Sequence, residues 1–175
     1  MENQESSPRK SRGRGCIFAL AAVAILIAVA AAWIIYTPHN RFPSAALEAL
    51  TADKNAVIYS LRPMGPSNLK GNDRPGFFRG HEIIGQTQVS SAEDRALFAG
   101  ELARSTQGRW DAAACFDPRH AFRASGPSGT FDFLLCYQCG RALVIGPDGR
   151  VKQILMGGKP DALNQYLTRH GIALE

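Results

Sequence analysis

Outside one segment, this chain of 175 residues is poor in apolar side chains. All 21 residues from Cys16 to Tyr36 are apolar, whereas the remainder is only about 38% apolar, below the roughly 45–50% usual in soluble domains. The sequence also lacks internal repeats and low-complexity tracts. Together with the modest length, these absences exclude a multidomain enzyme, a polytopic transporter and a long disordered tail. One small domain behind one hydrophobic segment remains.

The chain also lacks a basic stripe. Lys and Arg number 20 against 15 Asp and Glu, and beyond the hydrophobic segment the two signs are interspersed. Proteins that bind nucleic acid gather their basic residues on one face instead. No phosphate-binding loop and no pair of acid and base residues stands out. These absences argue against nucleic acid as a partner and favour a non-enzymatic accessory or interaction domain.

The hydrophobic segment at residues 16–36 has the length of a membrane span. A helix of 21 residues rises about 31 Å, close to the roughly 30 Å of the hydrocarbon core of a bilayer. The residues before it include four basic ones, Arg9, Lys10, Arg12 and Arg14. By the positive-inside rule, we expect a single-pass protein of the inner (cell) membrane with a cytoplasmic N-terminus and an extracytoplasmic C-terminal domain. A cleaved signal peptide is the alternative, and it would export the same domain.

Four parts are predicted along the chain: a basic cytoplasmic tail at 1–15, a transmembrane helix (signal anchor) at 16–36, a linker with a short helix at 37–54, and an exported domain at 55–175. The membrane is thus one expected partner, and another envelope protein is a second candidate. The sequence does not indicate the oligomeric state.

The exported domain is predicted to be α+β. Strand-like segments lie at 55–61, 77–89, 112–116, 120–124, 130–136, 141–145 and 150–155. Helices are predicted at 90–105, where Ser90 and Glu93 have capping-box spacing, and at 160–170. Because short turns join the later strands, those strands must pair antiparallel. We expect a mainly antiparallel sheet with about two packed helices.

Three of the four cysteines lie in this domain, and an odd number cannot all pair within one chain. His120 follows Cys115 by five residues, and Cys136-Tyr-Gln-Cys139-Gly140 has the spacing and trailing glycine of a zinc knuckle. Such a turn directs two thiolates to one point and lets backbone N–H groups reach the sulfurs. Cys115, His120, Cys136 and Cys139 are therefore candidate ligands of a structural zinc ion.

Other fates of the cysteines stay open. Because export favours oxidation, a disulfide can join Cys136 to Cys139, or Cys115 to either of them. A thiol–disulfide oxidoreductase also uses C-x-x-C, but its first cysteine begins a helix, and here strand-like residues flank the pair. A nucleophile pair of Cys115 and His120 would lack a third group to orient the imidazole.

The residues Cys-Phe-x-Pro-Arg-His at 115–120, followed by Leu-Cys-Tyr-x-Cys at 135–139, resemble a pattern in uncharacterised exported or membrane-anchored bacterial proteins. The resemblance covers roughly residues 55–156 and carries no known activity. It implies that six residues of these two motifs act as one unit: Cys115, Pro118, Arg119, His120, Cys136 and Cys139. We expect an accessory or interaction domain stabilised at this site, with an envelope thiol–disulfide oxidoreductase or a metal-handling module as alternatives.

Overall fold

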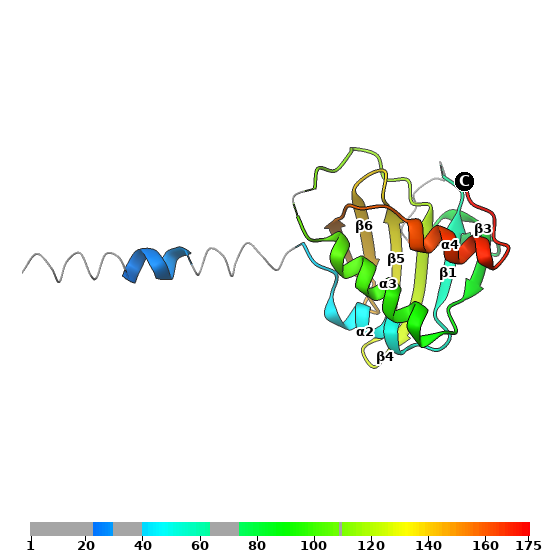
Figure 1. Ribbon diagram of the computed structural model, residues 1–175, viewed down its shortest axis with the longest axis horizontal. Helices are drawn as coiled ribbons and strands as arrows, with labels where there is room; N and C mark the ends of the chain where they lie inside the picture. Colours follow the sequence, from blue (N-terminus) through cyan, green and yellow to red (C-terminus); the bar gives the residue numbers. More distant parts are fainter. Residues whose placement is uncertain (1–22, 30–39, 64–73, 109) are drawn as a thin grey trace, which may run out of the picture. The chain divides into compact units, whose positions relative to one another are not determined.

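The computed structural model describes residues 23–29, 40–63, 74–108 and 110–175 (Figure 1). The chain divides into two compact units, Met1–His39 and Asn40–Glu175. In the first unit, residues 23–29 are helical. The second unit contains the elements described below.

The prediction of a transmembrane helix is overturned. No helix in the described ranges is long and apolar enough to cross a membrane. The predicted location, as a single-pass inner-membrane protein with an extracytoplasmic domain, depended on this transmembrane helix and is not supported either. Residues 1–15, and residues 16–22 and 30–36 of the predicted span, lie outside the described residues.

The second unit is an α+β domain built on a curled antiparallel sheet. The sheet has the strand order β2-β3-β1-β4-β5-β6-β7. The strands are β1 (Val57–Leu61), β2 (Phe77–Phe78), β3 (His81–Gln88), β4 (His120–Gly126), β5 (Gly129–Cys136), β6 (Arg141–Ile145) and β7 (Val151–Leu155). From β4 onward each strand pairs with the next along the chain, because the short turns leave no room for a crossover.

Three helices cover one face of this sheet, which we call the helix face: α2 (Ser44–Ala52), α3 (Ala92–Ser105) and α4 (Asp161–Arg169) (Figure 1). The main core lies between them and the sheet. In it, the Phe98 ring of α3 lies 5.5 Å from Phe122 of β4 and 5.2 Å from Tyr166 of α4, between ring centroids. The expectation of about two packed helices is too low, because α2 also buries Ala46, Ala49 and Leu50 in this core.

Two local predictions differ from the structure. The N-cap of α3 is Ser91, whose side chain accepts a hydrogen bond from the Asp94 N–H, and not Ser90. The segment at 112–116 is irregular and forms no strand. Its backbone is instead held against the turn between β5 and β6, where the Ala113 N–H donates to the carbonyl of Cys139 at 3.0 Å.

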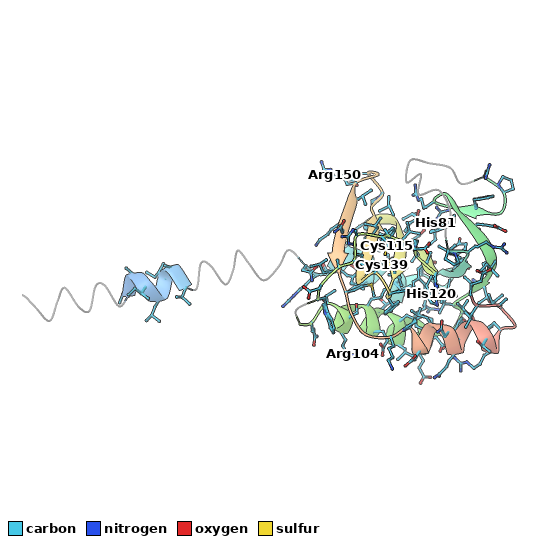
Figure 2. The ribbon with its side chains drawn as sticks, turned by 90° about the horizontal axis from the view of Figure 1, so that it is seen from above. His81, Arg104, Cys115, His120, Cys139 and Arg150 are labelled. Carbon is cyan, nitrogen blue, oxygen red and sulfur yellow. A yellow bond between two sulfur atoms is a disulfide. The ribbon has the colours of Figure 1, made fainter. Side chains whose placement is uncertain are left out.

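The opposite side of the sheet, which we call the second face, carries a smaller core. Tyr59 and Phe78 stack there with ring centroids 4.3 Å apart, and Phe116 packs against this cluster. The β2–β3 hairpin closes through Arg79 and Gly80, whose φ angles of 49° and 84° suit a two-residue type I′ turn. His81 begins β3 and lies away from the three helices in Figure 2.

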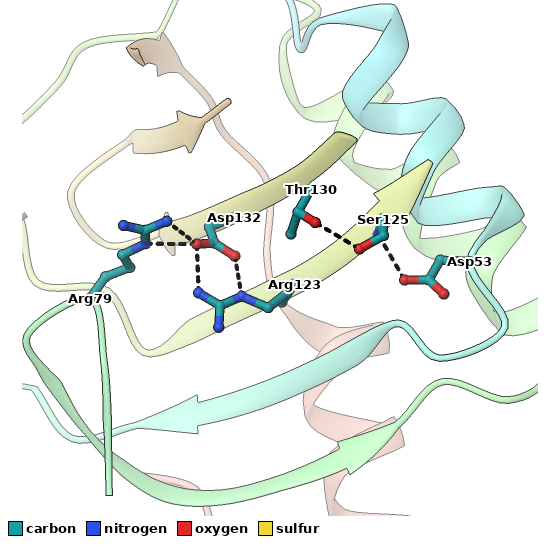
Figure 3. Close-up of polar contacts among 6 residues, drawn as sticks. All are labelled: Asp53, Arg79, Arg123, Ser125, Thr130 and Asp132. Carbon is teal, nitrogen blue, oxygen red and sulfur yellow. Dashed lines mark hydrogen bonds and ion pairs between the residues drawn. The ribbon is translucent and has the colours of Figure 1, made fainter. Parts of the chain in front are cut away.

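A buried carboxylate fastens this hairpin to the sheet (Figure 3). Asp132 of β5 is 1% exposed and stands opposite Arg123 of β4 in the register. Arg123 donates to both carboxylate oxygens, Nε to Oδ1 at 2.7 Å and Nη2 to Oδ2 at 2.8 Å. The Nε of Arg79, in the hairpin turn, donates to Oδ2 at 2.6 Å. Two guanidinium groups thus compensate one buried charge, as burial of a charge requires.

Candidate functional site

The C-x-x-C pair lies in a hairpin turn. Cys136 is the last residue of β5, residues 137–140 form the turn, and β6 begins at Arg141. The Gly140 N–H donates to the carbonyl of Tyr137 at 3.2 Å, which closes the turn. Cys136 and Cys139 are joined by a disulfide, with Cα atoms 5.2 Å apart. The pair therefore lies between two strands, and no helix begins at its first cysteine.

The third cysteine of the domain touches this disulfide. Cys115 is exposed, and its Sγ lies 3.6 Å from the Sγ of Cys139. By contrast, Cys136 and Cys139 are each only 2% exposed. Figure 2 shows Cys115 and Cys139 together on the side of the sheet away from the helices. The three residues form what we call the three-sulfur cluster: a buried disulfide in contact with one accessible thiol.

Two backbone N–H groups point at sulfur atoms of the cluster. The Asp117 N–H donates to the Sγ of Cys139 at 3.3 Å, and the Cys139 N–H donates to the Sγ of Cys136 at 3.1 Å. A sulfur that accepts an N–H hydrogen bond holds negative charge more easily, because hydrogen bonds to the charged form of a group favour that form. Both sulfurs of the disulfide thus have a donor in place for a thiolate.

Gly140 allows the loop that carries Cys115 to approach the turn between β5 and β6 closely. Its φ is +65°, and a Cβ at this position would lie 2.7 Å from the carbonyl oxygen of Asp111. On the other side, the Met156 N–H donates to the carbonyl of Gly140 at 3.0 Å. The turn is therefore held between the loop that carries Cys115 and the residue after β7. A side chain at position 140 would push this loop away.

His120 does not join the sulfurs. The register places it opposite Leu135, whose side chain belongs to the helix-face core. Because side chains alternate along a strand, Cys136 at the next position points to the second face. The Nε2 of His120 lies 2.7 Å from Oδ1 of Asn164 on α4. Burial lowers the pKa of His120, against the effect of the Asn164 hydrogen bond, and nearby Arg119 lowers it further.

The four predicted zinc ligands are thus not gathered at one point. No group of three or more His, Cys, Asp or Glu side chains in the described part of the chain is arranged to hold a metal ion. In addition, zinc binds cysteine as thiolate, and the disulfide leaves neither Cys136 nor Cys139 in that form.

The other predicted members of the site have structural contacts. Pro118 is buried, and Arg119 is exposed with its Nη1 donating to the backbone carbonyl of Glu175 at 2.9 Å. The Arg119 N–H donates to the carbonyl of Leu135 at 3.3 Å, so its backbone extends the pairing of β4 with β5. These residues fix where the loop carrying Cys115 enters the sheet.

A small pocket borders the cluster. Its volume is about 170 Å³, and its walls include Asp117, Arg119, His120, Cys136, Tyr137 and Pro160. It lies at the start of β4 and the end of β5, where residues from both faces of the sheet reach one opening. Burial, with nearby Glu101, raises the pKa of Tyr137, so its hydroxyl stays protonated at neutral pH.

Two residues near the site belong to no motif that could have identified them from the sequence. His81 is fully buried, and neither ring nitrogen has a hydrogen-bond partner in the described residues. Burial lowers its pKa, and the carboxylate of Asp117 opposes this effect. Asn164, which holds His120, lies in a helix with no motif around it. Both were recognisable only once the elements were assembled.

No model of a known protein family, no curated protein and no solved structure matches the chain. The function must therefore be inferred from the cluster itself.

Proposed function

We propose that this domain is a thiol–disulfide exchange module, in which Cys136 and Cys139 alternate between a disulfide and two thiols. The observation that carries the proposal is the 3.6 Å contact between the Sγ of the exposed Cys115 and the Sγ of Cys139. Exchange proceeds by attack of a thiolate on a disulfide sulfur. A thiol in van der Waals contact with a disulfide sulfur already lies beside the atom that its thiolate would attack.

The hydrogen bonds around the sulfurs support the same chemistry. In proteins of the thioredoxin type, a helix N-terminus stabilises the thiolate. Here no helix begins at the pair, but the N–H groups of Asp117 and Cys139 each donate to one sulfur of the disulfide. Reduction creates negative charge on these two atoms, and both donors are already directed at them.

A structural disulfide in a non-enzymatic accessory or interaction domain is the second candidate. Burial favours it, because Cys136 and Cys139 are each 2% exposed and an external thiol meets neither sulfur directly. In this case the disulfide only braces the hairpin between β5 and β6, and loss of the disulfide would lower stability without a functional cycle.

A redox titration of the full chain separates the two candidates. The protein is equilibrated in buffers with graded ratios of reduced and oxidised glutathione, alkylated, and mapped by mass spectrometry. An exchange module is expected to interconvert between roughly −270 and −120 mV, the range of known exchange proteins, while circular dichroism shows a folded domain throughout. A disulfide that stays intact to below about −300 mV would identify a structural brace and refute the proposal.

A further inference from the structure

We infer that Cys115 is the relay thiol of this domain, the group through which external thiols reach the buried disulfide. The inference rests on the proposed exchange function. Of the three cysteines in the cluster, Cys115 alone is exposed, and its Sγ contacts Cys139. A direct attack by an external thiol on Cys136 or Cys139 would require the protein to open, whereas the Sγ of Cys115 already lies in contact with the Sγ of Cys139.

The first step occurs within the chain. Cys115 gives its proton to solvent, and its thiolate attacks the Sγ of Cys139. The Cys115–Cys139 bond forms while the Cys136–Cys139 bond breaks, and the electron pair leaves on Cys136 as a thiolate. No external oxidant or reductant is consumed. The Cys139 N–H, 3.1 Å from the Sγ of Cys136, stabilises the charge on that leaving sulfur.

The second step involves the external thiol. Its thiolate attacks the Sγ of Cys115, the bond between Cys115 and Cys139 breaks, and the electron pair stays on Cys139. The Asp117 N–H, 3.3 Å from this sulfur, stabilises the charge. A second external thiol then releases Cys115. In sum, two external thiols become one external disulfide, and the Cys136–Cys139 disulfide becomes two thiols.

The internal exchange also moves the free sulfur. In one state the thiol is Cys115, on an exposed loop; in the other it is Cys136, which borders the pocket of about 170 Å³. Arg119 and His120 line the same pocket. The cluster thus has two isomers with the same number of electrons, and they differ in which sulfur is reactive.

Serine variants of the full chain test the relay. After incubation with oxidised glutathione, Cys136→Ser is expected to form the Cys115–Cys139 disulfide, which peptide mapping identifies and separates from any modification at Cys16. Cys139→Ser is the matched control, since it also keeps two cysteines of the cluster but lacks the contacted sulfur. It is expected to form at least about tenfold less disulfide between Cys115 and Cys136. Equal yields in the two variants, or no Cys115–Cys139 bond in Cys136→Ser, would overturn the inference.

Alkylation of the unaltered chain gives a second test that depends on no variant. Without reductant, the chain is denatured in mild acid, which stops exchange and exposes buried thiols, and is then treated with a maleimide; label is expected on Cys136 in some molecules and on Cys115 in others. Label on Cys115 alone overturns the relay; if the glutathione titration still shows a reducible disulfide, the exchange function stands without it. Label on Cys136 together with a disulfide that glutathione cannot reduce supports the internal exchange and refutes the proposed exchange with external thiols.

Discussion

Replacing Gly140 by Ala tests whether the hairpin turn holds the Cys115 loop in place. Gly140 has a φ of +65°, and an added Cβ would lie 2.7 Å from the carbonyl oxygen of Asp111, which is backbone and can yield only if the loop moves. Gly149, in the turn between β6 and β7, is a matched control. It has a φ of +74°, but a Cβ there meets nothing within 4 Å.

The two substitutions share one cost and differ in another. An alanine in the left-handed region costs about 1–2 kcal/mol at either position. Only at position 140 does the added methyl group also meet packed atoms, and overpacking costs about 1–3 kcal/mol more. We therefore expect Gly149→Ala to lose about 1–2 kcal/mol of unfolding free energy and Gly140→Ala about 2–5 kcal/mol. Effects of the methyl group on the unfolded chain are common to both variants and cancel in the comparison.

Urea unfolding measures this difference, with equal m-values required for the comparison. Displacement of the loop should also separate Cys115 from Cys139. In the Cys136→Ser background, Gly140→Ala is expected to lower the yield of the Cys115–Cys139 disulfide, whereas Gly149→Ala should leave it unchanged. If both alanine variants lose the same stability and give the same disulfide yield, the turn does not position the loop.

Two further predictions concern buried charge and pH. Asp132→Asn should cost about 3–5 kcal/mol of unfolding free energy in urea, because it leaves two guanidinium groups without their buried carboxylate. The control Asp148→Asn loses only the exposed ion pair with Arg150 and should cost less than about 1 kcal/mol. Similar costs for the two variants would refute the role given to Asp132. Burial lowers the pKa of His81 in the folded state, so the unfolded chain binds the proton first and stability falls as the pH drops below about 6.5. His81→Leu should reduce this slope by up to about 1.4 kcal/mol per pH unit, with the remainder coming from His120, and should not destabilise the domain near pH 7.5, since it removes no hydrogen bond. An unchanged slope would contradict this assignment.

The later half of the sheet could be predicted from the sequence because its signals are local. β6 begins and ends as expected, and the turn before β7 closes at Gly149 with a positive φ. At the end of α4, Gly171 also has a positive φ, as its place after the helix indicates. In each case neighbouring residues determine the structure. The short helix predicted within 37–54 is α2, but its contribution to the core depends on distant residues and could not be predicted from local signals.

Which side chains meet at the site depends on the pairing register of β4 with β5, and the sequence alone does not determine this register. Gly126 and Gly129 are opposed across a two-residue turn, which sets His120 opposite Leu135. The first predicted strand ends at 124 and the next begins at 130. These bounds do not determine, to within one residue, which residues of the two strands stand opposite each other. A shift of one residue exchanges the two faces of a strand. The sequence therefore identified the cysteines but could not show that His120 faces α4 while Cys136 faces away from it.

The transmembrane prediction failed for a related reason. Hydropathy and length describe what a segment permits, and residues 16–36 permit a span. The structure describes residues 23–29 of this segment, and no helix among the described residues is long and apolar enough to cross a membrane. Likewise, the 3.6 Å contact between Cys115 and Cys139 depends on how the loop at 111–117 packs on the turn, which no motif encodes.

The most direct test of the relay is the rate at which glutathione reduces the Cys136–Cys139 disulfide in the full chain and in Cys115→Ser. If Cys115 carries electrons to the buried pair, its removal should slow reduction at least about tenfold, because the external thiol must then wait for the protein to open. Cys16→Ser, which removes the one cysteine outside the three-sulfur cluster, serves as a matched control and should react at close to the unaltered rate. Equal rates for the unaltered chain and Cys115→Ser would contradict the relay.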